Sequence, residues 1–192
     1  MQIEGDIIML KDKNIIVGVT GGIAAYKSAS LISALKKEDA NVFVIMTKNA
    51  KEFITPLTLS TLSNNKVVED TFERIVNYDV EHISLAKRAD IFIIAPATAN
   101  ILGKVANGIA DDILSTTIMA TTAPVVFAPA MNNNMYNNKI VQNNIQKLKD
   151  YGYLFVEPDL GQLACGDNAV GKLASTTKII EKVKKVLSEV NL

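Results

Sequence analysis

The sequence predicts an α/β protein in which a mostly parallel sheet lies between two layers of helices. Short apolar runs of strand length alternate with longer segments whose apolar residues recur at helical spacing. Two of these runs, IFIIA at 91–95 and VVFA at 125–128, are apolar without alternation, as is typical of central parallel strands covered on both faces. The repeated order of strand and helix therefore favours parallel pairing through helical crossovers.

The predicted strands are short segments rich in β-branched and aromatic residues. They lie at 14–19, 41–46, 67–68, 91–95, 125–128 and 153–156, of which 67–68 is a minor strand and 153–156 the last. Pro96 and Pro129 directly follow two of these segments, and we expect them to end those strands.

The predicted helices are the segments whose apolar residues recur every three or four positions. They lie at 23–37, 51–63, 82–88, 101–120, 134–149 and 176–190. Pro56 breaks the second of them and Gly108 interrupts the fourth. Since no linker or low-complexity tract separates the elements, we expect residues 1–192 to form a single domain, with 1–12 as a short N-terminal extension.

These elements give a three-layer, doubly wound fold of the Rossmann or flavodoxin-like kind. In such folds, ligands bind beyond the carboxyl ends of the strands, near the switch in strand order. The residues that directly follow the strands are therefore the candidates for a functional site.

Composition and charge exclude several classes of function. The chain is 48% hydrophobic and carries 20 basic and 20 acidic residues, so it has no general attraction to nucleic acid or to an anionic membrane. Its one cysteine, Cys165, cannot form an intramolecular disulfide, and no Cys/His cluster offers a metal site. The apolar run at 7–10 is too short for a signal peptide or a membrane span. We expect a cytoplasmic protein without a metal.

A glycine pair follows the first predicted strand in the segment Thr20-Gly21-Gly22-Ile23. Glycines allow a tight turn and a close approach of ligand, and the free N–H groups of a following helix favour phosphate. Both common nucleotide motifs fail, because Tyr26 replaces the second glycine of a P-loop and GxGxxG lacks its second glycine. A mononucleotide such as FMN fits better, although a simple tight turn explains the glycines equally well.

Two further strands end in Ala-Pro-Ala followed by a polar side chain. These segments are APATAN at 95–100 and APAMN at 128–132. The small alanines let a flat ring approach the backbone, and Thr98, Asn100 and Asn132 supply uncharged donors and acceptors. Together with Thr20 and Thr47 at two other strand ends, they are expected to converge on one pocket.

The chain resembles the flavin-containing cysteine decarboxylases over nearly its whole length. The segments that carry the resemblance are VGVTGGIAAYK at 17–27, His82, PATAN at 96–100, PAMNNNM at 129–135 and LACGDNAVG at 163–171. In two places the sequence departs from the family pattern: PATANI replaces a PASANT-type segment, and Tyr136 stands where the family usually has tryptophan.

The resemblance implies non-covalently bound FMN and loss of the cysteine carboxylate from 4'-phosphopantothenoylcysteine, which gives 4'-phosphopantetheine. Losing carbon dioxide from a simple carboxylate requires an electron sink, which a flavin provides and the side chains do not. The family resemblance also implies that the protein is a homo-oligomer, either a trimer or a dodecamer built from trimers. The substrate would come from a phosphopantothenate–cysteine ligase on a separate chain, unless the sequence is a fragment of a fused protein.

The resemblance also assigns roles to residues. His82 is implied to be catalytic and to approach the flavin of a neighbouring subunit, and Cys165 is implied to protonate an enethiol intermediate. The implied substrate contacts are Asn132, Phe53, Ala164 and Gly166. The implied FMN contacts are Thr20, Gly21, Gly22, Ile23, Thr47, Ala97, Thr98, Ala99, Asn100 and Ala130.

Structural interpretations stand beside these roles. Asn132 can be a helix cap, Phe53 a core residue and Cys165 a buried hydrophobe. Gly161–Gly171 is too long and polar for a simple turn, so we interpret it as a flap over the pocket. For Lys172, a contact with the substrate's phosphate and ordinary solvation both stay open.

Three other functions of the same fold remain. A peptidyl-cysteine oxidative decarboxylase would stop at the enethiol and would not need Cys165 as an acid. A flavin prenyltransferase fits the PAMN segment and His82 less well. A non-enzymatic flavin-binding regulatory protein would tend to carry a long acidic extension, for which this chain leaves little room.

Overall fold

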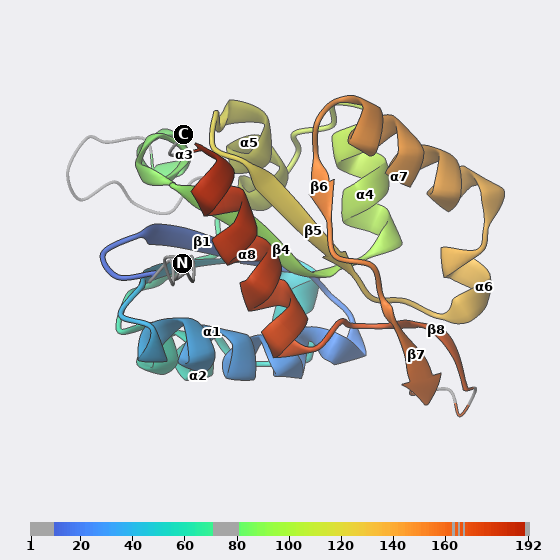
Figure 1. The fold of residues 1–192 in the computed structure, drawn as a ribbon, viewed down its shortest axis with the longest axis horizontal. Coiled ribbons are helices and arrows are strands. Elements are labelled where there is room, and N and C mark those ends of the chain that lie inside the picture. The colour runs from blue at the N-terminus through green and yellow to red at the C-terminus, as the bar shows by residue number, and fades with distance from the viewer. Residues whose placement is uncertain (1–9, 71–80, 163, 165, 167, 191–192) are drawn as a thin grey trace, which may run out of the picture.

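A parallel sheet of six strands forms the centre of the molecule (Figure 1). The computed structural model describes residues 10–70, 81–162, 164, 166 and 168–190, with the backbone alone at 81, 82 and 190. The strand order is β3-β2-β1-β4-β5-β6, so the winding reverses between β1 and β4, as in Rossmann-type sheets. The strands are β1 (Asn14–Val19), β2 (Asn41–Met46), β3 (Val67–Val68), β4 (Ile91–Ala97), β5 (Val125–Pro129) and β6 (Leu154–Phe155).

Helices cover both faces of this sheet and make the three predicted layers. Helices α1, α2 and α8 pack on one face, and α3, α4, α5 and α7 on the other (Figure 1). Successive side chains of β1 point to opposite faces of the sheet, so Ile15 and Val17 pack in the core under the first group of helices and Ile16 in the core under the second. The helices are η1 (Ile23–Tyr26), α1 (Lys27–Lys37), η2 (Lys48–Glu52), α2 (Pro56–Ser63), α3 (Glu81–Arg88), α4 (Ala99–Ala106), α5 (Ile113–Ala120), α6 (Asn133–Tyr136), α7 (Lys139–Asp150) and α8 (Thr176–Val190).

Two of the predicted helical segments are divided in the structure, 101–120 at its predicted interruption and 134–149 where one continuous helix was expected. The segment 101–120 forms α4 and α5, because Gly108 adopts a positive φ of 69° and Asp112 caps a new helix. The segment 134–149 forms the short α6 and then α7, whose first turn is capped by Asn138. Polar caps inside an apolar periodic segment are the local signal for these divisions.

The two prolines do not end their strands as predicted. Strand β4 continues through Pro96 to Ala97, and β5 includes Pro129. The register shifts between Ile94 and Ala97, after which Ala97 pairs with Pro129. Because these prolines lie at the last residues of the ladder, the missing N–H removes little pairing.

An antiparallel hairpin lies beyond the main sheet, where the sequence predicted an irregular flap. Its strands are β7 (Asp159–Gln162) and β8 (Asn168–Lys172). The prediction that 153–156 is the last strand is therefore wrong. The hairpin is attached to the sheet edge, because the Met131 N–H donates to the carbonyl oxygen of Gly171 at 3.0 Å. No helix among the described residues is long and apolar enough to span a membrane.

Candidate functional site

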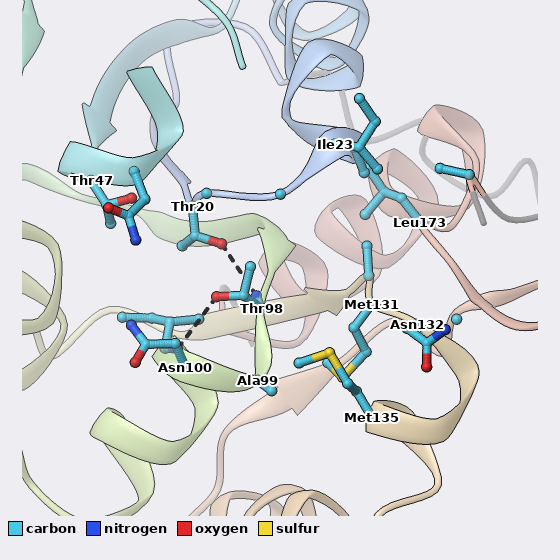
Figure 2. A pocket seen from close by; sticks show the side chains of 18 of the residues that line it. Thr20, Ile23, Thr47, Thr98, Ala99, Asn100, Met131, Asn132, Met135 and Leu173 are labelled. Atoms are coloured by element: carbon cyan, nitrogen blue, oxygen red, sulfur yellow. Dashed lines mark hydrogen bonds between the residues drawn. The ribbon is translucent and has the colours of Figure 1, made fainter. Parts of the chain in front are cut away.

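A pocket of about 1000 Å³ opens at the carboxyl ends of β1, β2, β4 and β5. This is the edge at which doubly wound sheets bind ligands, and the volume suits a mononucleotide together with a substrate. Figure 2 shows that side chains from these strand ends and from the hairpin region face one another across it. Its lining consists of Thr20, Gly21, Gly22, Ile23, Ala24, Tyr26, Lys27, Thr47, Lys48, Asn49, Thr98, Ala99, Asn100, Ile101, Lys104, Asp112, Ala130, Met131, Asn132, Met135, Gln162, Ala164, Gly171, Lys172 and Leu173.

Two buried hydroxyl groups fix the floor of this pocket. The Thr20 hydroxyl donates to the carbonyl oxygen of Pro96 at 2.7 Å. It also accepts from the Thr98 N–H at 3.2 Å, the bond drawn between these two residues in Figure 2. The Ser28 hydroxyl, fully buried on α1, donates to the carbonyl oxygen of Ala95 at 2.7 Å. These three bonds join the β1–α1 unit to the end of β4 and the residue that follows it, so the two central strand ends are held together.

The glycine pair serves two different purposes. A Cβ on Gly21 would lie 2.4 Å from the Cβ of Asn49, so only glycine lets this turn pack against η2. A Cβ on Gly22 would meet only Thr98 Cγ2 at 3.6 Å, which leaves space beside the pocket. The turn leads into the 3₁₀ helix η1 instead of directly into α1, which is a difference from the predicted helix at 23–37.

Asn132 lies on the opposite side of the pocket, on the connection between β5 and α6. Its Oδ1 accepts from the Asn134 N–H at 2.8 Å, so it caps α6 while it also lines the pocket. Met131 and Met135 flank it and supply apolar surface (Figure 2). The capping and site interpretations of Asn132 are thus compatible.

A charged cluster lies beside α4. The Lys104 ammonium is 2.6 Å from Asp111 and 2.8 Å from Asp112. Burial disfavours the ionised Asp112 carboxyl, but hydrogen bonds from Lys104 and Ser115 outweigh it and hold its pKa below the usual value. Asp112 and Ser115 form a capping box at the start of α5, which gives both side chains a structural role.

Most of the predicted site residues come together in this pocket. Those that line it are Thr20, Gly21, Gly22, Ile23, Thr47, Thr98, Ala99, Asn100, Ala130, Asn132 and Ala164. Ala97 is fully buried behind the lining, whereas Phe53 is 44% exposed on the surface and, like Gly166, is not part of it. The interpretation of Phe53 as a core residue is therefore wrong.

Neither predicted catalytic side chain belongs to the described part of the structure. Cys165 lies outside the described residues, between Ala164 and Gly166 in the sequence. His82 belongs to α3, but its side chain is outside the description, and no described residue of α3 lines the pocket.

Sequence reasoning missed several lining residues whose signal was present. Lys27 ends the segment VGVTGGIAAYK, and Met131 and Met135 lie within PAMNNNM, so each belongs to a segment already singled out. Gln162 and Leu173 carried no local signal, because their place in the pocket depends on how the hairpin docks.

Comparison with known proteins identifies the family. Residues 8–188 match the family model described as Flavoprotein. The chain belongs to the Flavoprotein family. Among curated relatives of this flavoprotein, the "Coenzyme A biosynthesis bifunctional protein CoaBC" of Borreliella burgdorferi is 52% identical, over 95% of this chain and 46% of that protein. The "Probable phosphopantothenoylcysteine decarboxylase" of Streptococcus mutans is 45% identical, over 91% of this chain and 99% of that protein.

The chain spans about half the length of the bifunctional relatives that it matches. Solved structures of similar fold include a cysteine-to-serine variant of PPC decarboxylase complexed with pantothenoylaminoethenethiol, with a TM-score of 0.82, 29% identity, and coverage of 93% of this flavoprotein and 100% of that chain. The FMN-dependent cysteine decarboxylase SpaF has a TM-score of 0.83 and 28% identity, over 95% and 99% of the two chains.

Proposed function

We propose that this flavoprotein is an FMN-dependent decarboxylase that converts 4'-phosphopantothenoylcysteine to 4'-phosphopantetheine and carbon dioxide in coenzyme A biosynthesis. The observation that carries the proposal is the meeting, in one pocket, of residues from the segments 20–23, 98–100, 130–135 and 162–173. The name of the Streptococcus mutans relative, which has nearly the same length, supports this substrate. The names of the bifunctional relatives support the pathway.

The pocket fits FMN. Gly22, Ala99 and Ala130 present little side-chain bulk, so a flat ring system can approach the backbone, while Thr47 and Asn100 offer uncharged donors and acceptors. Thr20 uses its hydroxyl within the protein, so we assign it to shaping this floor. When bound, FMN supplies the acceptor for the electron pair that must leave the substrate, which none of the lining side chains can accept.

We assign the substrate's carboxylate to the amide of Asn132. A neutral amide orients a carboxylate by hydrogen bonds, whereas a cation at this position would stabilise the charge that has to be lost as carbon dioxide. The bond from the Asn134 N–H to Oδ1 holds the Asn132 amide in one orientation. Met131 and Met135 present apolar surface beside it, which would limit hydration of the bound carboxylate and so favour its loss.

We assign the final proton to Cys165, which lies between β7 and β8 in the sequence, and an acid–base or carboxylate-pairing role to His82. Ala164 lines the pocket, which supports placing the neighbouring Cys165 near the substrate, and supports substrate contacts by Ala164 and Gly166. A thiol that delivers its proton to the enethiol carbon would complete the conversion to 4'-phosphopantetheine together with the hydride that the bound flavin, reduced in the first step, would return. Closure by the hairpin would keep water from the reactive sulfur intermediate.

We further propose that the enzyme works as a homo-oligomer in the cytoplasm, supplied by a phosphopantothenate–cysteine ligase. Exposed apolar side chains support assembly, since Ile23 and Tyr26 at the pocket, and Phe53 and Leu57 outside its lining, are each exposed by more than two fifths. A trimer in which His82 serves the neighbouring pocket would explain why no described α3 residue lines the pocket of its own chain. The fused relatives support the link to the ligase.

An absorbance spectrum followed by turnover in the same cuvette tests this proposal. We expect a flavin spectrum and, after anaerobic addition of 4'-phosphopantothenoylcysteine, a product lighter by carbon dioxide alone. A product lighter by carbon dioxide and two hydrogens would identify an oxidative decarboxylase that stops at the enethiol. Flavin without turnover would favour a binding protein, and a protein that takes up no FMN would overturn the proposal.

A further inference from the structure

Two lysines from different elements line the same pocket. Lys27 is the first residue of α1, directly after η1, and Lys172 is the last residue of β8. Lys172 directly precedes Leu173, and Lys27 follows Ile23 by four residues; we call the end of the pocket formed by Ile23 and Leu173 the hairpin end. Figure 2 places the hairpin end across the pocket from Thr47 and Asn100.

The two ammonium groups are close enough to repel each other. Burial lowers the pKa of Lys27 first, and the positive charge of Lys172 lowers it further, against a smaller opposing effect of Asp159. Within the described part of the chain, neither lysine forms an ion pair. The nearby Asp159 is already engaged, because it pairs with Lys178 and accepts from the Ser175 N–H at 3.0 Å. The repulsion at the hairpin end is thus only partly offset by the protein.

Other charged groups of the described lining do not change this balance. Lys104 is neutralised by Asp111 and Asp112, and Asp112 is the one carboxylate among the described lining residues. Lys48 adds a further positive charge at the pocket. A pocket with this excess of ammonium groups favours an anionic ligand.

The hairpin provides a specific place for the Lys172 side chain. A Cβ on Gly161, in the facing strand β7, would lie 3.2 Å from Cδ and 3.4 Å from Nζ of Lys172. A side chain at position 161 would therefore compete with the space that Lys172 occupies. Gly171 fixes the same strand, because its carbonyl oxygen accepts from the Met131 N–H at the sheet edge. The Lys172 ammonium is thus placed by the hairpin's own packing.

We propose that Lys27 and Lys172 form an anion subsite that binds the phosphate monoester of the substrate. The inference rests on the proposed function and adds the feature by which the enzyme would select a phosphorylated substrate over a peptide with a C-terminal cysteine. Two ammonium groups that lack a carboxylate partner suit a phosphate dianion, which relieves their repulsion and accepts a charge-assisted hydrogen bond from each. The phosphate of FMN is a second source of the same chemistry, and the uncharged donors of Thr47 and Asn100 at the other end favour placing it there.

Paired substrates that differ only in the phosphate provide the test. The variants are Lys27→Met, Lys172→Met and the double variant, since methionine keeps the apolar stem and removes the charge. The matched control is Lys37→Met, on the same helix α1 but outside the pocket lining. The holoenzymes are compared in kcat/KM for 4'-phosphopantothenoylcysteine and for pantothenoylcysteine. FMN content and the binding of 4'-phosphopantetheine and pantetheine by calorimetry are measured as well.

We expect each single variant to lose about tenfold in kcat/KM for the phosphorylated substrate, mainly through KM, with a larger loss in the double variant. Turnover of pantothenoylcysteine, FMN content and pantetheine binding should stay unchanged, and Lys37→Met should match the wild type. Equal losses on both substrates, or loss of FMN, would overturn the subsite. A wild-type holoenzyme that decarboxylates neither substrate would instead overturn the proposed function itself.

Discussion

The hydroxyl of Thr20 donates a hydrogen bond to the carbonyl oxygen of Pro96 at 2.7 Å, and so ties the end of β1 to the end of β4. The hydroxyl oxygen of Thr20 also accepts a hydrogen bond from the Thr98 N–H, and Thr20 is only 2% exposed. At the point where the strand order reverses, the Thr20 side chain thus joins the ends of β1 and β4 by hydrogen bonds to two backbone groups. A ligand that binds above this floor depends on that bond for the spacing of the two loops.

Replacing Thr20 by valine should therefore harm both stability and FMN binding. Valine keeps the shape but leaves the Pro96 carbonyl and the Thr98 N–H without this partner, which lowers the free energy of unfolding by about 1–3 kcal/mol. Thr20→Ser, which keeps the hydroxyl, is the control. Urea unfolding of the apoprotein and FMN titration measure the two effects. If the valine variant is as stable as the serine variant, the bond does not hold the ends of β1 and β4 together.

The two neighbouring glycines should respond differently to alanine. In Gly21→Ala the new Cβ lies 2.4 Å from the Asn49 Cβ and 2.8 Å from its backbone carbon, so η2 has to move. We expect a loss of about 1–3 kcal/mol in the free energy of unfolding. Gly22 is extended, with φ −161°, and its Cβ would meet only Thr98 at 3.6 Å, so Gly22→Ala should stay within about 1 kcal/mol of the wild type. Denaturant unfolding of both apoproteins compares them directly, and equal stabilities would contradict the close packing at Gly21.

The strand ends could be predicted from the sequence because their signals are local. A strand, a glycine pair and two Ala-Pro-Ala turns can each be recognised from a few neighbouring residues. Parallel pairing of the strands then brings Thr20, Thr98 and Ala130 to the same edge of the sheet. The fold class followed from the same alternation. The exact ends of β4 and β5 could not be predicted from this alternation, because the register shift in β4 depends on its pairing with β5.

The hairpin could not be predicted because its structure is set by distant contacts. The stretch 159–172 contains glycine, polar residues and little alternation, which is typical of a loop. Its strands pair with each other, and β8 docks through the bond from Met131 to Gly171. The proximity of Lys172 to Lys27 arises only from that docking, so no spacing in the sequence could indicate it.

The ionised Asp112 should contribute stability that disappears in acid. Its folded pKa lies below 3.8, the ordinary value, so its contribution is present above the pKa of the unfolded chain and is lost as pH falls through the folded pKa. Asp112→Asn keeps a good capping side chain but removes the charge opposite Lys104, and should lower the free energy of unfolding at pH 7 by about 0.5–1 kcal/mol. That difference should shrink below about pH 4.

Urea unfolding of the wild type and Asp112→Asn across this pH range measures the effect. Asp111→Asn serves as the matched control, because Asp111 also pairs with Lys104 but is more exposed and is not the cap of α5. Its effect should be smaller at every pH. A difference for Asp112→Asn that does not change with pH would contradict the lowered pKa.

Tyr136, which stands at the family's tryptophan position, should make a pH-dependent contribution at the alkaline end. Burial and the Glu157 carboxylate, which accepts its hydroxyl at 2.9 Å, raise the pKa of Tyr136 to about 12. Above about pH 10 the unfolded chain therefore loses this proton more readily than the folded protein, and stability falls. Tyr136→Phe should be about 1 kcal/mol less stable at pH 7, and the gap should narrow above pH 10. Unfolding at both pH values tests this, and a gap that widens would contradict it.

Replacing Cys165 by serine should separate the two halves of the proposed reaction. Serine is a far weaker acid than cysteine, so oxidation and loss of carbon dioxide should proceed, whereas protonation of the enethiol carbon should fail. Under anaerobic conditions, mass analysis should find a product lighter by carbon dioxide and two hydrogens, formed in a single turnover. Admitting oxygen should permit further turnover to the same enethiol, which shows that the remaining machinery is intact. Formation of 4'-phosphopantetheine at the wild-type rate would assign the proton to another group, and His82 would then be the next residue to replace.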